Sequence, residues 1–129
     1  MEHIPADDIR WEPAPTEFFD GKAWFGPMDE PDDPNGLLAL GVLFEPGART
    51  HWHRHPGGQT LYIVSGAGHV EKSDGEQVSV SAGDVVSVPP GEVHWHGASE
   101  DSYMMHLSLT TGGQTIWETG EVGYDSDRS

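Results

Sequence analysis

The chain has 129 residues, which suits one domain with a single hydrophobic core. Its 22 acidic and 6 basic residues give a formal net charge of −16, which repels phosphate groups and anionic lipids, so neither nucleic acid nor a membrane surface is an expected partner. Cysteine is absent, which excludes disulfides, thiolate metal ligands and a cysteine nucleophile.

Residues 1–36 contain repeated prolines, which prevent a long helix, and the part from 12 to 36 contains four aromatic residues that are expected to be buried: Phe18, Phe19, Trp24 and Phe25. We predict an irregular N-terminal arm that packs on the rest of the chain or on a second subunit. The first 13 residues are acidic and broken by proline, unlike a secretion signal, and no apolar run is long enough to span a bilayer. The expected location is therefore cytoplasmic.

From residue 37 onward, short segments rich in β-branched and aromatic residues alternate with glycine and proline, a pattern typical of strands joined by turns. This pattern predicts an all-β sandwich or barrel over residues 37–119. A polar tail follows at 120–129. The nine predicted strands are 37–44, 50–55, 60–66, 68–72, 77–81, 84–89, 93–97, 102–110 and 114–119.

Histidines cluster at two places in the chain. His51, His53 and His55 alternate along one predicted strand and would share a face, with a Pro-Gly-Gly turn directly after them. If that turn closes a hairpin, Gln59 lies opposite His55. His94 and His96 repeat the alternation after a second turn. Because imidazole is a preferred ligand of Zn, Fe, Ni, Cu and Mn ions, the pattern predicts a metal site.

Two stretches, GARTHWHRHPGGQTLYIVSG (47–66) and GDVVSVPPGEVHWHGA (83–98), resemble the two motifs of the cupin family. The matching positions are Gly47, His53, His55, Gln59 and Gly66, then Gly83, Pro89, Gly91 and His94. Gln59 stands where the family usually has glutamate, and Ala98 where it usually has asparagine. The resemblance covers about residues 37–110 and implies a double-stranded β-helix, a jelly-roll-like barrel. It further implies one divalent transition metal, Mn, Zn, Fe or Ni, held by His53, His55, Gln59 and His94.

More narrowly, the chain resembles the cupin-type hydroxynitrile lyases, which implies Lewis-acid chemistry on a small carbonyl-containing or aromatic compound. A ligand set without a carboxylate leaves the charge of the ion uncompensated and attracts anions such as alkoxide or cyanide. Less closely, the chain is similar to cupin-type polyketide cyclases, in which His96 would be an added ligand. Histidine ligands also suit a dioxygenase, and a non-enzymatic ligand-binding barrel is the remaining alternative.

The remaining histidines and the apolar strands suggest further roles. His96 and His106 are candidates for the acid and base beside the metal, or for side chains that orient a ligand. Leu40 and Val42 alternate on strand 37–44 and would line a small substrate pocket, unless they are plain core. Trp52 and Trp95 lie out of phase with the histidines, so they face away and need cover. We expect the arm or a partner subunit to supply that cover, and therefore a homodimer.

Overall fold

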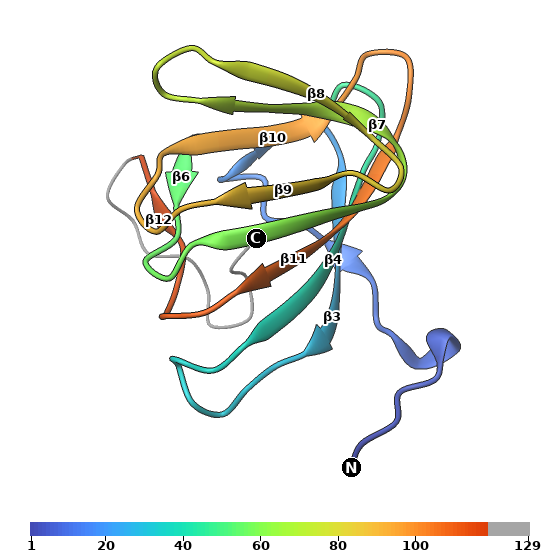
Figure 1. The fold of residues 1–129 in the computed structure, drawn as a ribbon. Coiled ribbons are helices and arrows are strands. Elements are labelled where there is room, and N and C mark those ends of the chain that lie inside the picture. Colours follow the sequence, from blue (N-terminus) through green and yellow to red (C-terminus); the bar gives the residue numbers. More distant parts are fainter. Residues whose placement is uncertain (119–129) are drawn as a thin grey trace.

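The computed structural model describes residues 1–118 of the chain (Figure 1). The predicted all-β class is confirmed. The predicted polar tail and the last residue of strand 114–119 lie outside the described residues. The elements are η1 (Ala6–Asp8), β1 (Glu12–Pro13), β2 (Phe19–Asp20), β3 (Ala23–Asp29), β4 (Leu38–Phe44), β5 (Arg49–Thr50), β6 (His53–Arg54), β7 (Gln59–Lys72), β8 (Gln77–Ser81), β9 (Val85–Val88), β10 (His94–Ala98), β11 (Met104–Thr110) and β12 (Ile116–Trp117).

The strands form two curled antiparallel sheets that share β7 and face one another (Figure 1). Sheet A has the order β1, β3, β4, β11, β7, β9, and sheet B has the order β8, β7, β10, β5, β2. In sheet B, β6 also pairs with β10 and with β12. Within residues 1–118, no helix is long and apolar enough to cross a membrane.

A single strand of 14 residues, β7, replaces the two strands predicted at 60–66 and 68–72. Its first part pairs in sheet A and its last part in sheet B. The crossing occurs at Gly66, whose φ of 78° is accessible to glycine at little cost. A Cβ at this position would also collide with the Tyr103 carbonyl oxygen. The glycine therefore bends one strand around the barrel instead of ending it.

The segment predicted to be an irregular arm contains three strands, β1 to β3. β3 pairs with β4 along most of its length and so extends sheet A. Phe18, Phe19 and Phe25 are buried against the barrel, and Phe18 stacks on Trp117 with ring centroids 4.4 Å apart. Trp24 is half-buried, and its indole N–H donates to Glu45 Oε2 at 3.0 Å.

The space between the sheets is apolar toward one end and polar toward the other. Leucine, isoleucine, valine and phenylalanine side chains fill the apolar part, with Leu40, Val42, Phe44, Leu61 and Ile63 all 0% exposed. The polar side chains buried at most 3% exposed include five imidazoles and one amide: His53, His55, Gln59, His94, His96 and His106. Burying so many imidazoles is costly unless they have partners, which indicates a functional site.

Candidate metal centre

Two short strands bring the two histidine motifs together. β6 pairs antiparallel with β10, and His53 lies directly opposite His94. The hairpin predicted between 50–55 and 60–66 is wrong, because β6 pairs with β10 and β12 and not with β7. Gln59 pairs instead with residues of β9 and β11, and it reaches the histidines as a buried residue at the start of β7.

The predicted strand 50–55 is interrupted at residues 51 and 52. The alternation predicted for His51, His53 and His55 is therefore only partly kept. His53 and His55 are buried, whereas His51 Nε2 lies 3.0 Å from Asp20 Oδ1 near the surface. His51 is thus held outside the cluster by an acidic partner from β2.

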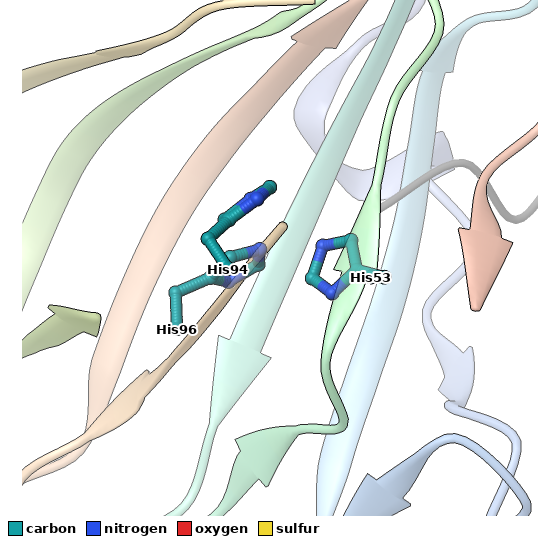
Figure 2. A group of neighbouring side chains, drawn as sticks. All are labelled: His53, His94 and His96. Carbon is teal, nitrogen blue, oxygen red and sulfur yellow. The ribbon is translucent and has the colours of Figure 1, made fainter. Parts of the chain in front are cut away.

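Three imidazoles converge on one point (Figure 2). One ring nitrogen from each of His53, His94 and His96 lies within 4.8 Å of the others, and Figure 2 shows the His53 ring turned toward the rings of His94 and His96. His55 lies next to this group, its ring centroid 5.0 Å from that of His53 and 5.8 Å from that of His94. The amide of Gln59 completes the group, with Oε1 2.8 Å from His94 Nε2.

Backbone carbonyls fix the tautomers of two of these rings. His53 Nδ1–H donates to the His51 carbonyl at 2.8 Å, and His94 Nδ1–H donates to the Glu92 carbonyl at 2.9 Å. Because a carbonyl only accepts, the proton of each neutral ring must sit on Nδ1. Each Nε2 therefore presents a lone pair, and His53 Nε2 has no hydrogen-bond partner among the described residues. Such outer partners orient metal-bound imidazoles in general.

The amide of Gln59 is also fixed in orientation. Its Nε2 donates to Ser108 Oγ at 2.7 Å, which leaves Oε1 to face His94. Two acceptors, Oε1 and the His94 Nε2 lone pair, then lie 2.8 Å apart in a buried setting. A cation between or beside them resolves this conflict. The donor set of imidazole nitrogens and an amide oxygen fits a divalent transition metal.

His96 links the cluster to His106. His96 Nδ1 lies 3.0 Å from His106 Nε2, so one ring donates to the other. His96 Nε2 has no hydrogen-bond partner among residues 1–118. Phe44 packs against both rings, with centroid distances of 5.8 Å and 5.3 Å. The structure thus brings His96 into the cluster and places His106 one hydrogen bond farther away.

Burial keeps these histidines neutral. Loss of solvent lowers the pKa of His53 and His96 well below the ordinary value of 6.5, and nearby histidines lower it further. Burial also lowers the pKa of His94, and it lowers the pKa of His106 to about 3. Neutral imidazoles are the form that binds a metal, so the site is ready for an ion at neutral pH.

The comparison with known proteins identifies the family. The cupin domain model matches residues 42–111. The chain is also 42% identical, over 96 residues, to an (R)-mandelonitrile lyase of Granulicella tundricola. The aligned residues make up 74% of this chain and 73% of that protein. The chain belongs to the cupin family. The fold predicted from the two motifs is thereby confirmed.

Solved structures agree with this assignment. A cupin-like protein of Thermotoga maritima matches this cupin with a TM-score of 0.80 at 36% identity, over 92% of each chain. A polyketide cyclase of Streptomyces resistomycificus matches with a TM-score of 0.69 at 20% identity, over 86% of this cupin and 79% of the cyclase. At this identity the second likeness shows the shared fold alone.

Some residues around the site were not predicted from the sequence. Thr50 is buried, and its Oγ1 accepts the His96 backbone N–H at 3.2 Å. The Trp117 ring packs against His53, with centroids 4.8 Å apart. Ser108 fixes the Gln59 amide. Strand alternation places Ser108 on the inner face of β11, but only the register of β11 against β7 puts it beside Gln59.

A surface cavity of about 320 Å³ reaches His94. Lys72 stands at its rim, with Nζ 3.0 Å from Glu76 Oε2. Five of its ten lining residues are aliphatic, Val70, Val78, Val86, Val88 and Pro89, and the others are polar or charged. The predicted pocket residues Leu40 and Val42 are instead 0% exposed and lie opposite Ser108 and His106. Their role as a substrate pocket stays a prediction.

Proposed function

We propose that this cupin is a metal-dependent lyase that cleaves cyanohydrins to a carbonyl compound and hydrogen cyanide, and forms them in reverse. The contact between Gln59 Oε1 and His94 Nε2 carries the proposal, because it puts a neutral amide where a carboxylate would offset the charge of the ion. The relative at 42% identity is named (R)-mandelonitrile lyase, and mandelonitrile is a cyanohydrin. The proposed substrates are therefore small hydroxynitriles with an apolar group.

The proposed ligands are the four predicted residues, His53, His55, Gln59 and His94. None of the four side chains brings a negative charge, and the burial that lowers the pKa of His53 and His94 keeps those two rings neutral. When bound, a divalent ion such as Mn, Zn, Fe or Ni would supply Lewis acidity toward a substrate oxygen or a cyanide anion. The first role of the protein is then to hold that ion with ligands that do not offset its positive charge.

The second role is proton movement by His96 and His106. With its proton on Nδ1, His96 donates to His106 Nε2 and offers a lone pair on Nε2. We assign His96 Nε2 to accept the substrate hydroxyl proton. The bond between the carbinol carbon and the nitrile carbon then breaks, and its electron pair leaves with cyanide. Cyanide takes a proton back from the histidine pair and departs as hydrogen cyanide.

The test is cyanide release from mandelonitrile. Metal-loaded protein is expected to release cyanide and benzaldehyde in equal amounts, and chelator-treated protein is expected to release them only at the background rate. His96→Asn should retain the metal while kcat falls by about 10² to 10⁴, the usual contribution of a positioned acid or base. A fully loaded protein that splits none of a panel of aliphatic and aromatic cyanohydrins would contradict the proposal.

One observation favours a second candidate, a cupin-type polyketide cyclase. The His96 ring nitrogen lies within 4.8 Å of those of His53 and His94, so His96 has the position of an added ligand. In that case His96→Asn would weaken metal binding, and a poly-β-keto chain would cyclise where mandelonitrile is inert. Oxygen uptake by the iron-loaded protein would indicate a dioxygenase instead. Binding of metal and small ligands without any turnover would indicate a non-enzymatic barrel.

A further inference from the structure

The two sheets separate along one seam, between β8 and β9. Among residues 1–118, each of these strands pairs with β7 alone, so β8 ends sheet B and β9 ends sheet A. The cavity of about 320 Å³ that reaches His94 opens at this seam, because residues of both strands line it. We call it the seam cavity.

The strand register places one wall of the seam cavity, on sheet B, beside two histidines of the site. Val70 of β7 lines the cavity and lies opposite His96 of β10. Lys72, two residues farther along β7, also lines it and lies opposite His94. Val78 of β8 extends the row, since it lies opposite Val70 on the other side of β7. Residues opposite one another in a ladder project from the same face of the sheet, so a molecule against this wall lies beside the histidines.

The other wall of the seam cavity, on sheet A, leads to the proposed amide ligand. Val88 of β9 lines the cavity and lies opposite Gln59 of β7. Val88 is 6% exposed, and Val70 on the facing wall is 4% exposed, whereas Val78 near the surface is 41% exposed. The seam cavity therefore runs from the surface to a buried end, where its walls are the strand neighbours of Gln59 and His96.

Charged side chains surround the outer opening of the seam cavity. Lys72 Nζ lies 3.0 Å from Glu76 Oε2 and 3.4 Å from Asp74 Oδ2. Glu92 Oε1 lies 3.7 Å from the same nitrogen. Three carboxylates around one ammonium group leave two negative charges in excess. A cleft edged by one sign of charge concentrates ions of the opposite sign and repels those of its own, so this opening disfavours anions and leaves neutral molecules unaffected.

We propose that the seam cavity binds the apolar group of the substrate and that its acidic opening restricts the substrates to uncharged ones, which rests on the lyase activity proposed above. The apolar group lies between Val70 and Val88, and the carbinol carbon lies toward His94. A volume of about 320 Å³ is near the lower end of the about 300–1,000 Å³ of small-molecule sites, which suits a branched alkyl chain or one aromatic ring. Hydroxynitriles that carry a carboxylate are poor substrates, because the opening repels them.

The first test is the protection of a thiol in the seam cavity. Because the chain has no cysteine, Val78→Cys puts a unique thiol on the cavity wall, and Ser79→Cys puts one on the opposite face of the same strand. The probe is 1-phenylethanol, which has the ring and the carbinol of mandelonitrile but no nitrile to lose. In the metal-loaded protein, the alcohol should slow the reaction of a neutral methanethiosulfonate at position 78 and not at position 79. Equal rates at position 78 with and without the alcohol would overturn the proposal.

A second measurement tests the charge of the opening. The ratio of the rates of a cationic and an anionic methanethiosulfonate should be about threefold higher at Val78→Cys than at Ser79→Cys, at an ionic strength of about 0.15 M. Lower ionic strength should widen this difference. Glu76→Gln should narrow it, because the substitution removes one of the excess charges. The same ratio at both positions would overturn the proposed selectivity.

Substrate preference tests the seam cavity through turnover. Val78→Trp, at a residue that is 41% exposed, should raise KM for mandelonitrile at least about tenfold, the usual effect of a misfit in an apolar pocket. KM for the smaller acetone cyanohydrin should change less, and Ser79→Trp should change neither value. Unchanged KM values for both substrates in Val78→Trp would overturn the proposal.

Failure of the seam cavity and failure of the lyase activity give different results. If 1-phenylethanol protects position 78 in a protein that cleaves no cyanohydrin, the lyase activity is contradicted and the seam cavity stands as a site for neutral alcohols. If the protein cleaves mandelonitrile but the alcohol protects nothing at position 78, the lyase activity stands and the seam cavity is overturned.

Discussion

Replacing His94 with alanine is expected to abolish metal binding and cyanohydrin cleavage together. His94 Nε2 lies 2.8 Å from Gln59 Oε1, and His94 lies opposite His53 in the strand register. Losing an outer hydrogen-bond partner of a ligand already weakens metal affinity roughly 10- to 100-fold, and losing a ligand should cost more. Elemental analysis of the purified variant, together with a chelator competition titration, measures the loss.

The matched control for this prediction is His51→Ala. His51 lies two residues from His53, but its ring bonds Asp20 outside the cluster. Only its backbone carbonyl supports His53, and alanine keeps that carbonyl. The control should therefore bind metal like the wild type. Equal metal content in both variants would place the ion somewhere other than the buried cluster.

The metal-free protein is expected to unfold in mild acid. Burial lowers the folded-state pKa of His53, His94, His96 and His106 below the ordinary 6.5. Above pH 6.5 these rings are neutral in both states, so they add no pH dependence. Below it, the unfolded chain binds protons that the folded chain excludes, and each ring lowers the unfolding free energy by about 1.4 kcal/mol per pH unit. Four such rings lower it by about 5 kcal/mol per unit, comparable with the whole stability of a small domain.

Urea unfolding at a series of pH values between 7 and 4 measures this slope. His106→Leu removes the ring whose pKa is lowered to about 3, so the slope below pH 6.5 should fall by about one quarter. Bound metal should move the acid transition to lower pH, because protons and the ion compete for the same nitrogens. A metal-free protein equally stable at pH 7 and pH 4.5 would show that the buried rings do not govern its acid response.

The sequence was sufficient to predict the family and the all-β class. It also singled out the histidines that the fold buries together, while their roles at the site stay predictions. The alternation of histidines correctly predicts that His94 and His96 are buried together, because β10 is a continuous strand. The same alternation wrongly places His51 in the cluster, because the predicted strand 50–55 is divided into β5 and β6. The pairing of β6 with β10 is a contact between distant residues, and local periodicity carries no information about which strand is the neighbour.

Proline and glycine misled the prediction at two places. Pro27 lies inside β3, which the sequence indicated as irregular. Proline is tolerated there because β1, the strand on that side, pairs only with Trp24 and Phe25. Among residues 1–118, no strand pairs with the rest of that edge. Gly66 suggested the end of a strand, but its positive φ bends β7 from one sheet into the other. In both cases the outcome depends on the neighbouring strands as well as on the residue itself.

X-ray absorption at the metal edge of the loaded wild-type protein tests the central claim most directly. We predict a coordination sphere of nitrogen and oxygen with the scattering pattern of at least three imidazoles. His53 and His94 present fixed Nε2 lone pairs, and His55 and Gln59 lie beside them. The 22 acidic residues offer an alternative, since exposed carboxylates also bind divalent ions. A sphere of oxygen ligands without imidazole would mean that the ion binds this acidic surface and that the buried histidines do not hold it.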